Sequence, residues 1–303
     1  MDIELGQSYS FCQLGGRKNQ EDARYPDMDE PHGGKPVFVV CDGVGGQDKG
    51  EVASRTVADA FGRYMQRVDL SRPFSADDFS KALSYAYQAL DKAMPDGSDE
   101  MATTLTFICF HDGGVLVAHI GDSRIYHIRP QVGILYRSND HSLVNALVHS
   151  GNLTPQEAEN HPQSNYITRC MGHGRSSGER ASAIVLEIDD VEAGDYFFLC
   201  TDGVLHELDD RRLQAVLESG KTDREKMAEI ALACRKSSDN NTAYLIPVER
   251  VYGHDRNDSV TQSVETGNQT VPINVSDVTV SEVSASKLTV GGKFSLFIKN
   301  LFK

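Results

Sequence analysis

The sequence predicts an α+β fold built from antiparallel strands and separate pairs of helices. Two apolar strands, Thr103–Phe110 and Val115–Ile120, are joined by His111-Asp112-Gly113-Gly114, which is a typical hairpin turn. Two helical stretches, Gly50–Val68 and Ser71–Met94, follow one another without a strand between them. This grouping favours a segregated α+β arrangement over a repeated parallel βαβ unit.

The remaining elements follow from hydrophobic spacing and from residues that start or end helices. Apolar residues at three-to-four spacing predict helices, whereas short apolar or alternating runs predict strands. Ser75 with Asp78 and Thr154 with Glu157 are typical helix starts. The other predicted strands are Ile3–Gln13, Val37–Cys41, Ile125–Ile128, Gly133–Tyr136, Ala183–Ile188, Tyr196–Thr201 and Thr242–Val248, and the other helices are Leu143–Gly151, Thr154–Asn160, Leu213–Leu217 and Glu225–Cys234.

Length and composition limit the class of protein. A chain of 303 residues can form one large domain or two ordinary ones, and its net charge of −14 argues against a nucleic-acid binder. The six cysteines are scattered without a Cys-x-x-Cys pair, which favours buried core thiols in a reducing compartment over disulfides or zinc. No apolar segment precedes the first strand and no stretch is long enough to span a bilayer, so we expect a cytoplasmic protein.

The composition changes after about Arg250. Residues 250–290 are rich in Ser, Thr and Val and are expected to be a flexible linker, although the alternating valines could pair as a strand. Residues 291–303 form an amphipathic Lys/Phe segment. This segment could contact a membrane surface, dock on a partner or pack on its own domain.

Two strands end in Asp-Gly, and these ends are the first candidates for a functional site. The strand from Val37 ends at Asp42-Gly43, followed by two more glycines, and the strand from Tyr196 ends at Asp202-Gly203. Each could be an ordinary turn. However, a carboxylate held at the end of a buried strand beside open backbone also suits a hard cation.

Further carboxylates stand at strand ends or in turns, and the full set is Glu21, Asp22, Asp42, Asp122, Asp202 and Asp239. If these segments converge, the repulsion between them requires cations, and oxygen ligands select Mg²⁺ or Mn²⁺ over Zn²⁺. Two ions that share a carboxylate lower the pKa of a water. Arg17 offers a planar fork for phosphate oxygens, or alternatively a surface salt bridge. The residue types therefore predict metal-assisted phosphoester hydrolysis.

Seven motifs follow one another along the chain: Arg17-x-x-x-Glu21-Asp22, Asp42-Gly43-x-Gly45-Gly46, Thr103-Thr104, Gly121-Asp122-Ser123-Arg124, Asp140-His141-Ser142, Thr201-Asp202-Gly203 and Asp239-Asn240-x-Thr242. Their order and spacing resemble those of the metal-dependent protein phosphatase family (protein phosphatase type 2C) in its short bacterial form. The resemblance covers about residues 5–248 and implies a four-layer α-β-β-α sandwich with a metal cleft at the sheet edges. It also implies hydrolysis of phosphoserine and phosphothreonine in proteins, an activity that opposes a protein kinase.

The resemblance implies a role for each matching residue. It implies a phosphatase domain over residues 1–249, with a flap at about 143–165 that includes Asn165. For Asp122, a role as a turn residue is an alternative to the metal role given below. The implied roles are metal bridging for Asp42, a carbonyl ligand for Gly43, completion of one metal site for Asp202 and Asp239, a water-mediated contact for Glu21, orientation of that shell for Asp22, phosphate binding for Arg17 and a weaker third metal site for Asp122.

The sequence departs from the family pattern at two positions. Val44 stands where many members carry a histidine proposed as the general acid, and His206 stands where many carry an aspartate of the third metal site. We therefore expect a weak or altered third site, or one that depends on Glu207. The alternative that these departures raise is a non-catalytic phosphoprotein-binding or regulatory module on the same fold. His119, His127 and His141 are expected to be strand or turn residues.

Overall fold

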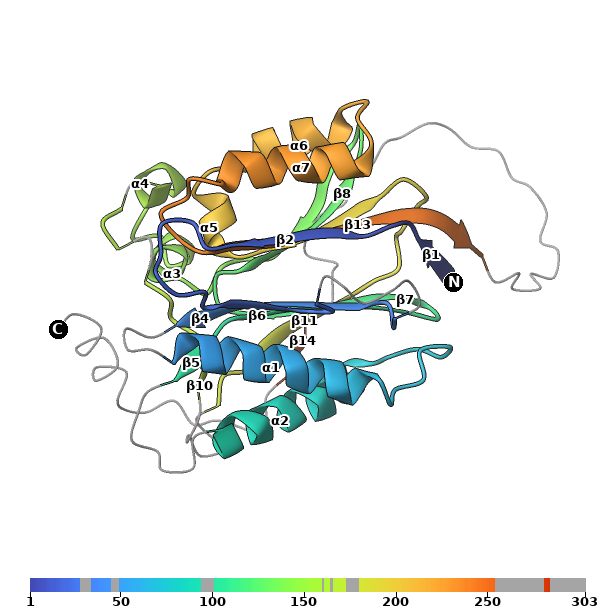
Figure 1. The fold of residues 1–303 in the computed structure, drawn as a ribbon, viewed down its shortest axis with the longest axis horizontal. Helices are drawn as coiled ribbons and strands as arrows, with labels where there is room; N and C mark the ends of the chain where they lie inside the picture. The colour runs from blue at the N-terminus through green and yellow to red at the C-terminus, as the bar shows by residue number, and fades with distance from the viewer. Residues whose placement is uncertain are drawn as a thin grey trace.

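The computed structural model describes residues 1–27, 34–44, 49–93, 101–159, 161–163, 166–172, 180–253 and 281–283. Two antiparallel sheets lie face to face, and helices cover the outer face of each sheet (Figure 1). The predicted α+β class and the four-layer sandwich are confirmed.

The first sheet has the strand order β1-β13-β12-β8-β9, with β2 also paired to β13. In Figure 1 it lies under α6 and α7. Its strands are β1 (Asp2–Leu5), β2 (Tyr9–Gln13), β8 (Arg124–Arg129), β9 (Gly133–Arg137), β12 (Tyr196–Cys200) and β13 (Asn241–Tyr252).

The prediction of one strand over Ile3–Gln13 is wrong, because the chain forms β1 and β2 there. Leu5 pairs with Val248 and Tyr9 pairs with Leu245, both in β13. The segment between Leu5 and Tyr9 is therefore one residue longer than the segment of β13 that it faces. Pro247 lies in that interval and has no amide hydrogen to donate to a ladder.

The second sheet has the order β10-β5-β4-β6-β7-β11-β14, with β3 paired to β4. The predicted hairpin is present as β6 and β7. Neither β3 nor β10 was predicted from the sequence. The strands are β3 (Asp22–Tyr25), β4 (Val37–Val44), β5 (Ala102–Thr103), β6 (Leu105–His111), β7 (Gly114–Ile120), β10 (Met171–Gly172), β11 (Ala183–Ile188) and β14 (Ser281–Val283).

The helices form two outer layers and one group at the end of the sandwich. α1 (Gly50–Met65) and α2 (Ala76–Ala93) cover the second sheet, and α6 (Asp210–Glu218) and α7 (Asp223–Cys234) cover the first (Figure 1). α2 begins as predicted, since Ser75 and Asp78 exchange backbone-to-side-chain hydrogen bonds of 3.3 Å. At one end of the sandwich lie α3 (Leu143–His149), α4 (Pro155–Glu159) and α5 (Asp202–Leu205).

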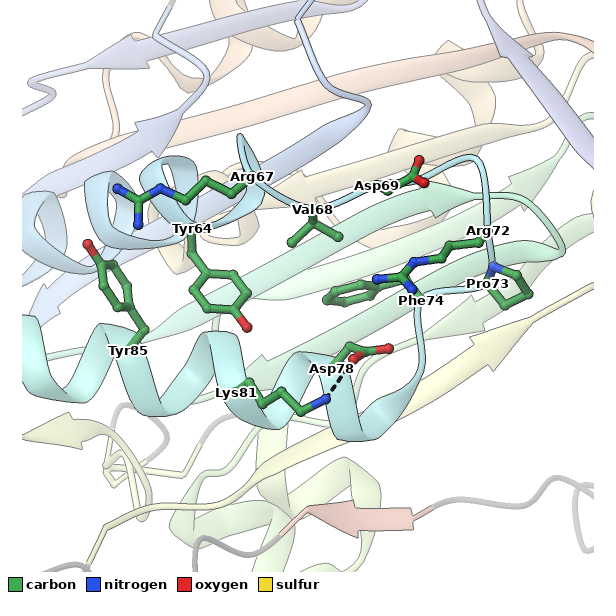
Figure 2. A pocket seen from close by; sticks show the side chains of 10 residues that line it. All are labelled: Tyr64, Arg67, Val68, Asp69, Arg72, Pro73, Phe74, Asp78, Lys81 and Tyr85. Atoms are coloured by element: carbon green, nitrogen blue, oxygen red, sulfur yellow. Dashed lines mark hydrogen bonds and ion pairs between the residues drawn. The ribbon is translucent and has the colours of Figure 1, made fainter.

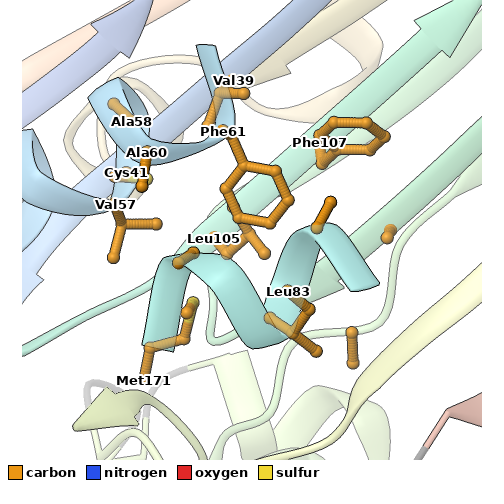
Figure 3. Packing of buried hydrophobic residues seen from close by; sticks show 14 of the residues in the cluster. Val39, Cys41, Val57, Ala58, Ala60, Phe61, Leu83, Leu105, Phe107 and Met171 are labelled. Carbon is orange, nitrogen blue, oxygen red and sulfur yellow. The ribbon is translucent and has the colours of Figure 1, made fainter. Parts of the chain in front are cut away.

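Strand alternation explains the four layers. In β4, Val39 and Cys41 pack under α1 and α2, where Phe61 and Phe107 fill the same core (Figure 3). The alternate residues Phe38 and Val40 belong to a second core, which lies between the two sheets. A third core lies under α5, α6 and α7. A strand with apolar residues on both faces therefore needs a layer on each side, as β4 has.

The C-terminal region lies mostly outside the described residues. Ser281–Val283 within the predicted linker form β14, which pairs with the edge of β11. The predicted segment 291–303 lies outside the described residues. None of the described helices is both long and apolar enough to cross a membrane. The cysteines among the described residues are free, and four of them are buried.

Candidate metal centre

Asp42 lies near the end of β4, with its backbone fixed on both sides by two threonines. The amide of Asp42 donates to Thr104 Oγ1 at 2.9 Å, and its carbonyl accepts from the Thr104 amide and from Thr103 Oγ1, both at 2.8 Å. The strand continues past Asp42 through Gly43 to Val44, rather than turning at Asp42 as predicted. This continuation is possible because Gly43 packs against the backbone of Gly50, where an added Cβ would lie 2.3 Å from the Gly50 carbonyl carbon. Gly45 and Gly46 lie outside the described residues.

Asp22 faces Asp42 across the β3–β4 ladder. The two residues are direct register partners. Asp22 is 3% exposed, and its Oδ2 accepts from Thr201 Oγ1 at 3.0 Å. Because Thr201 directly follows β12 of the first sheet, this bond connects the two sheets at the carboxylates. Asp22 is therefore a buried residue at the start of a strand, although the sequence around it is polar.

Asp202 and Asp239 come from the first sheet. Asp202 begins α5 directly after β12, and Asp239 lies in the loop before β13. Thr201 and Thr242 connect these strands: the Thr201 amide donates to the Thr242 carbonyl, and the Thr242 amide donates to Thr201 Oγ1, both at 3.0 Å. A Cβ on Gly203 would lie 1.9 Å from the Asn240 carbonyl oxygen. Glycine at 203 therefore allows the two loops to approach closely.

Glu21 and Arg17 reach this region from the loop between β2 and β3. The Glu21 amide donates to Asn240 Oδ1 at 2.8 Å, and the Glu21 carbonyl accepts from the Gly43 amide at 3.0 Å. Arg17 Nη2 donates to Asp239 Oδ2 at 2.6 Å. The backbone of Glu21 thus joins the Asp42 strand to the Asp239 loop.

Asp122 lies in the turn between β7 and β8 and is 8% exposed. The neighbouring Ser123 hydroxyl lies 2.7 Å from Thr104 Oγ1, so the turn is attached to the residue that fixes Asp42. Gly121 has φ of +106° and its hypothetical Cβ would lie 2.6 Å from Thr104 Cγ2. A side chain at Gly121 would therefore push this turn away from the site.

The buried carboxyl groups interact electrostatically. Burial raises the pKa of Asp42 well above its ordinary value, and the charges of Asp22, Asp202, Asp122 and Asp239 raise it further. Burial also raises the pKa of Asp22 to about 7, against hydrogen bonds from threonines that lower it. Burial is also the largest cause that raises the pKa values of Asp122 and Asp202. The structure thus brings these groups close enough for each charge to oppose the next.

The carboxylate and carbonyl oxygens of this site fit hard divalent cations. Asp22 Oδ1, Asp122 Oδ1 and Asp202 Oδ1 are buried atoms without a hydrogen-bond partner, which is costly unless a cation binds them. Among the described residues, no three His, Cys, Asp or Glu side chains form a ready-made cage. The carboxylates instead use protein partners, as Asp239 does with Arg17. Carboxylate oxygens and the Gly43 carbonyl are ligands typical of Mg²⁺ or Mn²⁺.

The histidines lie at the edge of this region or further away. His206 Nε2 is 3.9 Å from Asp202 Oδ2, so it stands beside the site as the departure from the family pattern suggests. His141 stacks on His119 with ring centroids 4.9 Å apart, and its Nδ1 accepts from the Gly121 amide. Burial lowers the pKa of His141 to about 3, so it is a neutral turn residue at physiological pH. His127 is a buried strand residue that pairs with Asp195.

Several positioning residues have no role in the sequence prediction, namely Thr104, Thr201, Ser123 and Asn240. All four stand within the family motifs, and Thr201, Ser123 and Asn240 are each adjacent to a predicted ligand, which was the available signal. Their partners could not be deduced, because the Thr201–Asp22 and Asn240–Glu21 bonds join residues 179 and 219 positions apart.

The predicted flap starts beside the candidate centre. The Leu143 amide donates to the Tyr166 carbonyl at 2.8 Å, and the Thr168 amide donates to the His141 carbonyl at 2.7 Å. These bonds close the two ends of the 143–165 segment next to the Asp122 turn. Asn165 lies outside the described residues.

A two-sheet sandwich with converging carboxylates at its edge defines the class of metal-dependent phosphohydrolases. Residues 17–234 match the family model described as protein phosphatase 2C. The chain belongs to the protein phosphatase 2C family, and its enzyme class is that of the metal-dependent serine/threonine protein phosphatases.

Individual relatives agree with this assignment. Protein phosphatase PhpP of Streptococcus pneumoniae is 31% identical over 211 residues, which cover 67% of this chain and 81% of that protein. Serine/threonine protein phosphatase PstP of Mycobacterium tuberculosis is 30% identical over 237 residues, which cover 76% of this chain and 42% of that protein.

Solved structures show the same architecture. Serine/threonine phosphatase Stp1 of Staphylococcus aureus aligns with a TM-score of 0.69 and 27% identity, covering 82% of this chain and 98% of that one. The catalytic domain of PstP in complex with two manganese ions aligns with a TM-score of 0.65 and 26% identity, covering 81% and 99%.

Proposed function

We propose that this protein hydrolyses phosphoserine and phosphothreonine in proteins, using two Mn²⁺ or Mg²⁺ ions held at Asp42. The observation that carries this proposal is the set of mutually repelling buried carboxyls, three of which leave an oxygen without a partner. When bound, such ions neutralise the carboxylates, lower the pKa of a water and polarise the phosphoryl group. The two manganese ions of the PstP neighbour support this ion count.

Each residue then has a defined task. Asp42 and the Gly43 carbonyl would hold both ions, and Asp202 and Asp239 would hold one of them. Glu21 and Asp22 act around this shell, since Asp22 is held by Thr201 Oγ1 at 3.0 Å and can accept further bonds through Oδ1. Arg17, whose side chain is 52% exposed, binds phosphate oxygens at the mouth of the site. Asp122 would contribute to a third, weaker metal site, and His206 lies 3.9 Å from Asp202 Oδ2.

Val44 supplies no acid, so the leaving alkoxide of the serine or threonine is protonated by water or by a residue other than Val44. The exposed position of Arg17 is compatible with solvent reaching the phosphoryl group. A general acid with a defined side chain is therefore not required by this geometry.

The proposal also assigns a function to each part of the chain. Residues 1–249 form the phosphatase domain, with the segment at about 143–165 as a flap for substrate choice, and 250–290 connect it to a docking segment at 291–303. The substrates are phosphorylated proteins, and the enzyme opposes a protein kinase in the cytoplasm. Deletion of 290–303 should leave hydrolysis of a phosphopeptide unchanged but weaken association with membranes or partners; unchanged association would remove the docking role.

The direct test is hydrolysis of a phosphothreonine peptide by the full chain with Mn²⁺. Asp42→Asn should abolish turnover and Mn²⁺ binding by calorimetry, while Asp59→Asn on the exposed face of α1 serves as the matched control. An inactive wild type that still binds phosphopeptide without metal would instead indicate the non-catalytic module. Equal activity of Asp42→Asn and wild type would refute the proposal.

A further inference from the structure

A pocket of about 400 Å³ opens in the outer helix layer, away from the candidate metal centre. It is formed by the C-terminal end of α1, the loop after it and the first half of α2 (Figure 2). None of the candidate metal ligands lines it. Its volume lies within the range of about 300–1,000 Å³ that is typical of small-molecule sites.

Two arginines stand at opposite ends of this pocket in Figure 2. Among the described residues, the side chains of Arg67 and Arg72 form no ion pair and no hydrogen bond. Other surface arginines of this chain do form ion pairs, for example Arg63 with Asp59 and Arg250 with Glu4. The two pocket guanidiniums therefore keep their donors available for a ligand.

The two carboxylates at the pocket are already engaged by local partners. Asp69 accepts from the amide and the hydroxyl of Ser71, at 3.1 and 2.7 Å. Asp78 accepts from Ser75 Oγ and from Lys81 Nζ, both at 2.9 Å, and the second contact is drawn in Figure 2. These acids fix the loop and the helix start. The hydrogen bonds from Ser71 lower the pKa of Asp69 and the charge of Arg72 lowers it further, so Asp69 partly neutralises Arg72 without forming an ion pair with it.

Aromatic rings supply the apolar part of the pocket. The rings of Tyr64 and Tyr85 lie 5.6 Å apart at 49°, one from each helix. Phe74, which is 2% exposed, lines the pocket and also packs on Phe107 in the core. Flat rings facing an open pocket favour a flat apolar group, and tyrosine hydroxyls can add hydrogen bonds.

The overall charge sharpens the choice of ligand. The chain carries a net charge of −14 and repels anions in general. At physiological salt this repulsion is screened beyond about 8 Å, so two unpaired guanidiniums can still attract an anion locally. A bare anion would gain little at such an exposed site, whereas one attached to a flat apolar body would also bury surface against the tyrosines.

From this combination we propose that the α1–α2 pocket is a second ligand site, which binds a small organic anion, a phosphate or carboxylate attached to a flat ring. Arg67, which lies beside Tyr64 and Tyr85 in Figure 2, binds the anionic group, and these two rings contact the flat ring. Arg72 adds positive charge at the other end of the pocket. The site is separate from the metal centre, so its ligand is not the substrate.

The test is calorimetric titration of the full chain, loaded with Mn²⁺, with 1-naphthylphosphonate, whose P–C bond is not cleaved by phosphoester hydrolysis. Two binding events are expected in the wild type, one at the metal centre and one at the pocket. R67Q/R72Q should lose the pocket event, or weaken it at least about tenfold, the loss expected from one or two charge-assisted hydrogen bonds. R55Q, an exposed α1 position outside the pocket, should retain both events.

Two further arms separate this site from the proposed function. Asp42→Asn should lose only the event at the metal centre, so a phosphatase that fails to bind metal would still show the pocket event. Inorganic phosphate should bind the pocket more weakly than the naphthyl compound. The proposal is overturned if Asp42→Asn removes all binding, if R67Q/R72Q binds as the wild type does, or if inorganic phosphate binds the pocket equally well.

Discussion

Arg17 Nη2 lies 2.6 Å from Asp239 Oδ2, so the residue assigned to phosphate is bonded to a residue assigned to metal. The hydrogen bond to Asp239 is the main cause that raises the pKa of Arg17. A cation at this oxygen competes with the guanidinium, because the two positive charges repel. We therefore expect cation binding at Asp239 to weaken the bond to Arg17 and to free the guanidinium for phosphate.

Arg17→Ala should raise KM for a phosphothreonine peptide and lower kcat/KM by about 10–100-fold, the loss expected from one charge-assisted hydrogen bond of roughly 1.5–3 kcal/mol. Mn²⁺ affinity should stay the same or increase, because Asp239 loses a competing partner. Steady-state kinetics and Mn²⁺ titration check both effects. Arg250→Ala, which removes a surface pair with Glu4, is the control. Weaker Mn²⁺ binding with an unchanged KM would contradict this competition.

Gly203→Ala should destabilise the fold and separate Asp202 from Asp239. A Cβ at 203 would lie 1.9 Å from the Asn240 carbonyl oxygen, so the backbone has to move, at a cost of roughly 2 kcal/mol or more. Gly220→Ala is the matched control, since its Cβ would meet nothing within 4 Å. Urea unfolding and Mn²⁺ titration of both variants measure the difference. Equal stability of the two variants would show that the close approach at Gly203 is not needed.

The elements that the sequence predicted well are those defined by local patterns. Ala183–Ile188 forms β11 with the predicted bounds. α7 begins at Asp223, two residues before the predicted start at Glu225, and Thr222 is the N-cap of a capping box. Buried strands and capped helices carry their signal within a few residues, so no distant contact is needed to recognise them.

The arrangement of the site depends on contacts that local patterns do not contain. The polar run before Asp22 has no strand signal, yet Asp22 begins β3 because it pairs with Asp42 in the register of β4. Likewise, nothing in the sequence around Thr201 distinguishes it from other threonines at strand ends. Its bond to Asp22, at 3.0 Å, forms only because the two sheets pack together. The identities of the acidic candidates could therefore be predicted from the sequence, whereas the residues that orient them could not.

Removal of metal should make stability decrease as pH rises. Burial raises the pKa of Asp22 to about 7 in the folded chain, while an unfolded aspartate has an ordinary pKa near 3.9. Between these values the folded state binds more protons than the unfolded state, so the free energy of unfolding falls as pH rises through this window. Each 1 kcal/mol corresponds to roughly 2–4 °C in Tm for a domain of this size.

Thermal unfolding between pH 5 and pH 8 measures this effect, once with EDTA and once with Mn²⁺. Tm in EDTA should fall across the range, and the gain in Tm from Mn²⁺ should grow, because the cations bind ionised carboxylates. Asp22→Asn should flatten the EDTA curve. Parallel curves with and without Mn²⁺ would show that the buried carboxylates are not linked to metal binding.

Acid stability should depend on Asp195, which lies far from the metal ligands along β12. Its buried carboxylate accepts from His127 Nε2 and Arg129 Nε, both at 2.8 Å. Burial alone would raise the pKa of Asp195, but these hydrogen bonds outweigh it and lower the pKa to about 2. This stabilisation is therefore fully present above the ordinary pKa near 3.9 and is lost as pH falls towards 2.

Asp195→Asn should reduce the free energy of unfolding at pH 7 by about 3 kcal/mol, since it leaves buried donors without their charged partner. Asp190→Asn removes a 70% exposed partner of the same Arg129 and should cost less than about 1 kcal/mol. Denaturant unfolding at pH 7 and at pH 3 compares the two variants with the wild type. The deficit of Asp195→Asn should shrink at pH 3, because the wild-type carboxylate begins to lose its advantage there. A deficit that is equal at both pH values would mean that packing, rather than the charge of Asp195, holds this part of the sheet.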